Sequence, residues 1–265
     1  MTHGEKVALF RKLHQGPRIL VLPNASDVAG ARIFENAGFP AVGTSSAGVA
    51  FSLGYPDGQR ISRGEMIGVV KRIAGALSIP VTADVEAGYG DPVATADALV
   101  EAGAVGMNLE DVTGDDESSL VDLKTQAQII ERIRSKTGLV INARTDIYLL
   151  GIGEPATRFE RTVERLNAYR NTGADCLFAP GVRDAETIAK LARAVNGPLN
   201  ILATLGSPPV AELERLGVRR VSVGSGPTRA AMGLMQRIAK ELREQGTYSA
   251  MTDGTIPYAD ANRLF

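Results

Sequence analysis

Short apolar runs rich in β-branched residues recur along the chain, and each is followed by a polar or glycine-rich turn and then a helical pattern. Eight such runs begin near Arg18, Ala41, Pro80, Gly106, Leu139, Cys176, Leu199 and Arg220. Strands that alternate with helices form parallel sheets, because the helix returns the chain to the start of the next strand. Eight roughly even units favour closure into a (β/α)8 barrel over the alternative, an open doubly wound sheet.

Helical patterns fill the intervals between these runs, at residues 63–77, 94–102, 125–136, 158–172, 185–195 and 210–216. A glycine precedes many of the runs, at Gly38, Gly103, Gly138, Gly173, Gly197 and Gly217. We expect each of these glycines to end a helix in the left-handed conformation, which glycine adopts without a Cβ clash.

The length of the chain predicts a single domain over residues 1–265, since such barrels commonly run to about 250 residues. No linker divides the sequence. From about residue 227 we expect a C-terminal helical tail, with one more helix through Glu244 and then a polar segment. That segment is expected to pack on a partner or on the barrel rim.

Charge, hydropathy and cysteine usage limit the partners and the cellular location that we expect for this chain. The net charge of −1 comes with no basic block, so no nucleic-acid partner is expected. There is no apolar stretch of about 18 residues and no signal-peptide pattern, so no membrane association is expected. The single cysteine, Cys176, fits a reducing compartment, and it begins an apolar run typical of a core residue. These features predict a cytoplasmic location.

Polar side chains gather at the ends of three consecutive strand runs, where catalytic residues of such barrels lie. Side chains two residues apart share one face of a strand. This rule groups Thr82 with Asp84 and Glu86, Asn108 with Glu110, and Asn142 with Arg144 and Asp146. If these faces point inward, three carboxylates and a guanidinium meet at the barrel mouth.

Asp84, Glu86 and Glu110 are the candidate metal ligands, because burying three carboxylates without a cation is expensive. An all-oxygen set suits Mg²⁺. The other acids near turns are interpreted as helix N-caps or solvated turn residues, namely Asp91, Asp111, Asp115, Asp116 and Asp122.

Several other chemistries are excluded by residue placement. His3 and His14 precede the first strand, which argues against a Ser-His-Asp triad at the mouth. All lysines lie in helical or flanking segments, so a Schiff-base lysine inside the barrel is not expected. No phosphate-binding glycine motif is present. Metal, carboxylate, arginine and tyrosine chemistry remain.

The motifs ADVEAGYG at 83–90, NLED at 108–111 and NARTD at 142–146 together resemble those of the isocitrate lyase/phosphoenolpyruvate mutase superfamily. The stretch 22–48 resembles its first two units, and YPDGQRIS at 55–62 resembles the loop after its second strand. PLNILATLGSP and LGVRRVSVG resemble its last two strands. The likeness covers nearly the whole chain.

The resemblance implies a metal role for three residues. Asp84 matches the principal Mg²⁺ ligand of the superfamily, while Glu86 and Glu110 match acids that hold the ion, often through its waters. Asp57 matches an active-site acid near the metal. The resemblance also implies a (β/α)8 barrel whose eighth helix is exchanged between subunits, usually in a tetramer. A homo-oligomer, a dimer of dimers, is therefore expected.

The resemblance implies substrate contacts as well. Ser45, Ser46 and Ala47 match the turn that grips the substrate carboxylate, and Arg144 matches the arginine that binds the substrate. Asn142, on the inferred face of Arg144, is assigned to substrate binding.

The proton source is open between Tyr55, Tyr89 and a metal-bound water. Among these, Tyr89 is the residue that we assign as catalytic, together with Asp57 and Arg144.

One stretch departs from the superfamily pattern. Lyases carry a cysteine in a basic lid after the fourth strand, and phosphonate mutases use lysine and asparagine there. The matching VTGDDESSLVDL is acidic and has none of these residues.

We therefore expect a Mg²⁺-dependent enzyme that breaks a bond at the β-carbon of a small α-oxo or 2-hydroxy carboxylate through an enolate. The predicted reaction is that of a C–C lyase or decarboxylase of a dicarboxylate. The alternatives are a phosphonopyruvate-type C–P mutase or hydrolase and a non-catalytic α-oxocarboxylate-binding protein.

Overall fold

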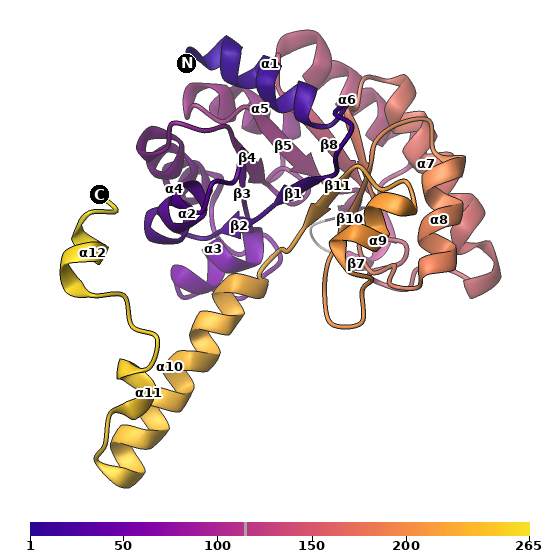
Figure 1. Cartoon of the computed structure of the whole chain (residues 1–265). Helices are drawn as coiled ribbons and strands as arrows, with labels where there is room; N and C mark the ends of the chain where they lie inside the picture. Colours follow the sequence, from indigo (N-terminus) through magenta and orange to yellow (C-terminus); the bar gives the residue numbers. More distant parts are fainter. Residues whose placement is uncertain (114–115) are drawn as a thin grey trace.

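A computed structural model describes residues 1–113 and 116–265, and it arranges them as a barrel of parallel strands surrounded by helices (Figure 1). The barrel strands are β1 (Leu20–Leu22), β2 (Asn24–Ala25), β3 (Val42–Thr44), β4 (Val81–Asp84), β5 (Gly106–Leu109), β8 (Val140–Arg144), β9 (Cys176–Phe178), β10 (Leu199–Leu202) and β11 (Arg220–Ser222). The helices are α1 (His3–Leu13), α2 (Val28–Asn36), α3 (Ser46–Ser52), α4 (Arg63–Ala76), α5 (Pro92–Glu101), α6 (Leu123–Lys136), η1 (Pro155–Thr157), α7 (Arg158–Asn171), α8 (Ala185–Ala194), α9 (Val210–Arg215), α10 (Gly226–Gln245), α11 (Ser249–Thr252) and α12 (Tyr258–Asn262).

The strand order shows that the sheet nearly closes on itself. The order is β1-β11-β10-β9-β8-β5-β4-β3-β2, and neighbouring strands pair in parallel. β1 and β2 stand at the two ends of this order, yet only Pro23 separates them in the chain. Because proline has no N–H for a sheet ladder, the first predicted strand run is split there and contributes to both sides. The predicted (β/α)8 barrel is confirmed.

A hairpin that the sequence analysis did not predict follows β5. It consists of β6 (Val112–Thr113) paired antiparallel with β7 (Asp116–Leu120). This hairpin lies in the acidic stretch VTGDDESSLVDL. The interpretation of Asp115 and of the Asp116 side chain as capping or turn groups lies outside the described residues.

Side-chain caps set the starts of the helices next to the site. Asp91 and Asp122 accept backbone N–H bonds at the starts of α5 and α6, which confirms their predicted N-cap roles. Ser62 and Glu65 form a reciprocal capping box at the start of α4.

Four of the six predicted helix-ending glycines adopt the left-handed conformation. Gly38, Gly103, Gly173 and Gly217 have φ angles between 86° and 113°. The prediction was wrong for the other two glycines, Gly138 and Gly197. There the residue at the C-cap, Thr137 after α6 and Val195 after α8, is already extended, so the chain leaves the helix without a left-handed turn.

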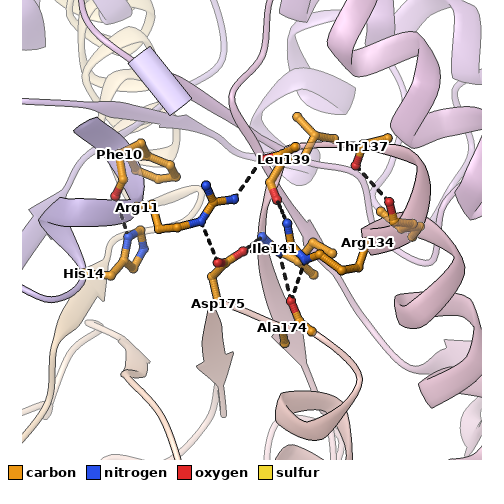
Figure 2. A network of polar contacts seen from close by, with 12 residues as sticks. Phe10, Arg11, His14, Arg134, Thr137, Leu139, Ile141, Ala174 and Asp175 are labelled. Atoms are coloured by element: carbon orange, nitrogen blue, oxygen red, sulfur yellow. Dashed lines mark hydrogen bonds and ion pairs between the residues drawn. The ribbon is translucent and has the colours of Figure 1, made fainter. Parts of the chain in front are cut away.

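A polar network closes the N-terminal end of the barrel, where it joins α1 and α6 to the strands (Figure 2). The Asp175 carboxylate accepts hydrogen bonds from Arg11 Nε at 2.9 Å and from the Ile141 N–H at 2.9 Å, and it also pairs with Arg134. His14 bonds through Nδ1 to the Phe10 carbonyl at 2.8 Å. This face opposes the strand ends that carry the candidate site, so the network serves stability.

Cys176 is fully buried, as expected, and burial raises the pKa of its thiol to about 12. The C-terminal helix α10 runs away from the barrel; α11 folds back against its far part, and the chain then turns back, so that α12 stands beside α10 and apart from it (Figure 1). None of the residues of α10 is buried. In the described chain, no helix is both long enough and apolar enough to cross a membrane.

Candidate active site

Three neighbouring strands bring the predicted polar side chains to one level of the barrel. The register pairs Asp84 of β4 with Asn108 of β5, and Asn108 with Asn142 of β8. Asn142 Nδ2 donates to Asn108 Oδ1 at 2.9 Å, and Asn108 Nδ2 lies 3.4 Å from Asp84 Oδ1. The inward orientation inferred from strand alternation is confirmed at these positions.

Asp84 is held at the start of α3. One of its oxygens accepts from both the N–H of Ser46, at 3.2 Å, and the Ser46 hydroxyl, at 2.9 Å. Ser45 caps α3, with its Oγ accepting the Gly48 N–H at 3.3 Å, so its hydroxyl is committed to the helix. Ala47 follows in the first turn of α3. Of these three predicted contacts, Ser46 faces the acids.

Glu86 reaches the same region through a turn, because β4 ends at Asp84 and Glu86 has a left-handed φ of 50°. Its carboxylate accepts from the Gln59 N–H and, at 3.1 Å, from the Tyr89 hydroxyl. Burial, together with Asp84 and then Asp57, raises the pKa of Glu86 to about 7. Burial and Glu86 also raise the pKa of Tyr89, so its hydroxyl stays protonated and donates at neutral pH.

Arg144 forms ion pairs with two carboxylates, those of Glu110 and Asp146. Its Nη1 lies 2.8 Å from Glu110 Oε2, while its Nε and Nη2 donate to the two oxygens of Asp146 at 2.6 and 2.8 Å. Burial raises the pKa of Glu110 well above its usual value and opposes the lowering effect of Arg144. An arginine has five N–H groups. Three are used here, which leaves two for a ligand.

These side chains surround a cavity of about 120 Å³ at the mouth of the barrel. Its polar lining includes Ser46, Asp57, Glu86, Glu110, Arg144 and Asp146, and its apolar lining includes Val112, Leu149 and Leu150. Five of the predicted site residues therefore converge on one cavity.

The other predicted site residues lie around this cavity. Asp84 lies behind Ser46, to which it is hydrogen-bonded. Tyr89 lines a second, adjoining cavity of about 540 Å³. Asn142 is fully buried and bonded to Asn108, so it supports the site from below. Tyr55, the other candidate proton donor, is 40% exposed.

Asp111 was predicted to be a capping or turn residue, and that prediction was wrong. It is fully buried, and one of its oxygens accepts from Arg165 Nε and from the Tyr169 hydroxyl, both at 2.7 Å. Its other oxygen accepts the Asp146 N–H at 3.1 Å. The triad of Asp111, Arg165 and Tyr169 thus positions Asp146, which in turn holds Arg144.

Arg220 is a second residue that the sequence analysis missed. It is fully buried inside the barrel, where Nη2 donates to Asn108 Oδ1 at 3.1 Å and Nη1 lies 3.4 Å from His14 Nε2. Because Arg220 and Asn142 both donate to Asn108 Oδ1, the Asn108 amide must present its NH₂ to Asp84. Strand alternation is the signal that could have found it, because Arg220 shares one face of β11 with Ser222, whose hydroxyl is bonded to Asn200 in the buried interior.

The donor set fits a hard divalent cation in its chemistry. In the described part of the chain, no three acid, histidine or cysteine side chains are grouped closely enough to hold a metal ion. Glu110 is paired with Arg144. Yet Asp84, Glu86 and Glu110 supply only oxygen ligands, and mutual repulsion helps to raise the pKa of Glu86. A cation would relieve that repulsion, and Mg²⁺ prefers such ligands. The metal assignment stays a prediction.

Fold and site together define a (β/α)8-barrel protein with a carboxylate- and arginine-lined cavity at the C-terminal ends of its strands. The profile of the family described as phosphoenolpyruvate phosphomutase matches residues 10–243. The chain belongs to this family, and so to the isocitrate lyase/phosphoenolpyruvate mutase superfamily.

Named relatives of the chain are similar over almost its whole length. An oxaloacetate decarboxylase from Rhodopseudomonas palustris (strain TIE-1) is 31% identical over 273 residues, which cover 98% of this chain and 89% of the relative. A solved Burkholderia cenocepacia J2315 protein is 38% identical, with a TM-score of 0.92 over 99% of this chain and 96% of its own. A solved oxaloacetate acetylhydrolase in complex with the product oxalate is 26% identical, with a TM-score of 0.86 over 98% and 93%.

Proposed function

We propose that the protein is a Mg²⁺-dependent enzyme that binds a small α-oxo or 2-hydroxy dicarboxylate and breaks a bond at its β-carbon through an enolate. The reaction is that of a C–C lyase or decarboxylase. The observation that carries this proposal is the cavity of about 120 Å³ on which Ser46, Asp57, Glu86, Glu110 and Arg144 converge. Two of the similar proteins are an oxaloacetate decarboxylase and an oxaloacetate acetylhydrolase, whose substrate class suits such a cavity.

Asp84, Glu86 and Glu110 are the residues that would hold Mg²⁺. When bound, the ion supplies a Lewis acid for the carboxylate and carbonyl oxygens of the substrate. Ser46 and Asn108 fix the orientation of Asp84, so this carboxylate is held in place before the metal ion or the substrate binds.

Arg144 is proposed to bind the substrate and to stabilise the negative charge that develops on it. Asp146 holds the guanidinium through two parallel hydrogen bonds, which fixes its plane, and two N–H groups remain for the ligand. A preorganised donor of this kind stabilises charge without reorganisation during the reaction.

Tyr89 is the proposed proton donor. Its hydroxyl is already hydrogen-bonded to Glu86 at the junction of the two cavities. Tyr55 is more exposed and lines neither cavity in the described part of the chain.

The test is a panel of oxo and hydroxy acids assayed for pyruvate release with Mg²⁺ and with a chelator. Release of pyruvate from oxaloacetate or a related C–C substrate that requires both the protein and Mg²⁺ is the expected result. Consumption of phosphonopyruvate alone, to pyruvate and phosphate or to phosphoenolpyruvate, would replace this proposal by C–P cleavage, the activity class that the family description favours. Binding of oxalate with no turnover across the panel would make the protein a non-catalytic α-oxocarboxylate-binding protein.

We also propose that the protein is a homo-oligomer, a dimer of dimers, in which α10 is exchanged between subunits. The 20 residues of α10 include no buried residue, although the helix carries the exposed apolar side chains Met232, Leu234, Met235 and Leu242. A second copy of the chain would bury this face.

A further inference from the structure

Among its described lining residues, the inner cavity offers no basic side chain that could bind a second carboxylate of the substrate. Within the described chain, its only basic lining residue is Arg144, which already pairs with Glu110 and Asp146. Asp57 and Glu86 add further carboxylates to the same lining. The proposed Mg²⁺ and the two free N–H groups of Arg144 serve the α-oxo acid end of the substrate. A second carboxylate must therefore find its partner elsewhere.

The adjoining cavity of about 540 Å³ offers such a partner. The two cavities share Gly58, Glu110 and Val112, so a ligand in one can extend into the other. Two arginines line the outer cavity, Arg60 and Arg63. Arg63 begins α4 and interacts electrostatically with Asp91, whereas within the described part of the chain the Arg60 guanidinium has no hydrogen bond or ion pair. Among the described residues of this outer lining, Glu110 is the one carboxylate, and it is occupied by Arg144.

The residues on both sides of Arg60 are held in place by contacts with the rest of the protein. Gln59 has a left-handed φ of 56°, its N–H donates to Glu86, and its side-chain oxygen accepts the Tyr89 N–H at 2.8 Å. Ile61, on the other side, is 3% exposed and packs in the main core. A non-glycine residue in this conformation costs free energy and persists only where its surroundings enforce it. The loop therefore places beside the entrance to the inner cavity a guanidinium that has no partner among the described residues.

We propose that the outer cavity is the subsite for a second carboxylate of the substrate, and that Arg60 binds this carboxylate and sets the preference for dicarboxylates. The inference rests on the proposed function, because it assumes that the α-oxo acid end occupies the inner cavity. A guanidinium pairs with a carboxylate through two parallel hydrogen bonds, which a neutral amide cannot replace.

The experiment measures binding by calorimetry in the presence of Mg²⁺ with two probes. Oxalate fills only the inner cavity, whereas 3,3-difluorooxaloacetate also carries the distal carboxylate. Arg60→Gln should weaken binding of the longer probe at least about tenfold and leave oxalate affinity within about twofold. Arg60→Lys should lie between Arg60→Gln and the wild type for the longer probe. Arg193→Gln, at an exposed arginine on α8, is the matched control and should change neither.

The outcomes separate this inference from the proposed function. If wild-type protein binds oxalate with Mg²⁺ and Arg60→Gln leaves the affinity for the longer probe unchanged, the subsite is wrong and the proposed function stands. Equal weakening of both probes by Arg60→Gln would also contradict a subsite for the second carboxylate. If wild-type protein binds neither probe, the proposed function fails and the subsite fails with it.

Discussion

Arg144 combines two tasks at the scale of a single residue. Its guanidinium neutralises Glu110 and Asp146, and it also lines the inner cavity with two N–H groups to spare. The charge pairing alone could be structural, because an unpaired buried carboxylate is destabilising. The geometry separates the two tasks, since Asp146 uses the Nε edge of the guanidinium and so leaves other N–H groups for a ligand.

Replacing Arg144 with lysine tests which task dominates. A lysine has no planar fork, so Arg144→Lys should weaken oxalate or pyruvate binding at least about tenfold, or about 1.4 kcal/mol. Melting temperature and ligand affinity are measured on the same sample. A lower melting temperature with intact affinity would mean that Arg144 is only a structural partner of Glu110 and Asp146.

Strand alternation predicted the positions of Asp84, Asn108, Asn142 and Arg144, because alternation is a local property of an extended chain. It could not predict Asp111, whose partners Arg165 and Tyr169 lie 54 and 58 residues away on α7. Such pairing depends on how helices pack around the barrel, which no local pattern contains.

At the scale of elements, the eight strands were predictable because each apolar run ends at its own turn. The hairpin of β6 and β7 was not, because its sequence is acidic and lacks the alternation of apolar and polar residues that marks a half-buried strand. Its base is tied to the barrel by tertiary contacts, with the Val121 N–H donating to the Asp111 carbonyl at 2.8 Å and Arg165 Nη2 donating to the Val121 carbonyl at 2.5 Å.

The packing of α1 against the barrel makes stability depend on pH through His14. Burial, and then the nearby Arg220, lower the pKa of His14 to about 4, below its usual 6.5. Between these values the unfolded chain binds a proton that the folded chain does not, so stability is present above about pH 6.5 and is lost as the pH falls toward 4. From pH 7 to pH 5 the loss should be about 2 kcal/mol.

Urea unfolding at pH 7 and pH 5 measures this loss, with His14→Gln as the matched variant. Glutamine can retain both hydrogen bonds of His14, to Phe10 and to Arg220, without titrating. The variant should therefore lose about 2 kcal/mol less than the wild type between the two pH values. Equal losses in the two proteins would show that His14 titrates normally in the folded state.

At the scale of the whole molecule, α10 is the element that the barrel does not explain. It projects from the body of the protein (Figure 1). Its side chains Met232, Leu234, Met235 and Leu242 are exposed. An exposed apolar face on a long helix is typical of a protein interface, and the proposed exchange between subunits would bury it.

Sedimentation velocity tests the exchange. Wild-type protein should sediment as an oligomer, whereas Met235→Glu, at a side chain that is 69% exposed, should shift it to smaller species because a carboxylate would be buried at the interface. Glu244→Gln, near the end of the same helix, is the control and should sediment like the wild type. A monomeric wild-type protein would contradict the exchange.

The central claim is that Asp84 anchors a Mg²⁺ ion on which binding of the α-oxo acid depends. The most direct measurement is calorimetric titration of Mg²⁺, and then of oxalate, into wild-type protein and Asp84→Ala, with circular dichroism to verify the fold. Wild-type protein should bind oxalate only with Mg²⁺ present, and folded Asp84→Ala should lose this metal-dependent binding. Unchanged Mg²⁺ affinity in Asp84→Ala, or oxalate binding that is indifferent to Mg²⁺, would contradict the claim.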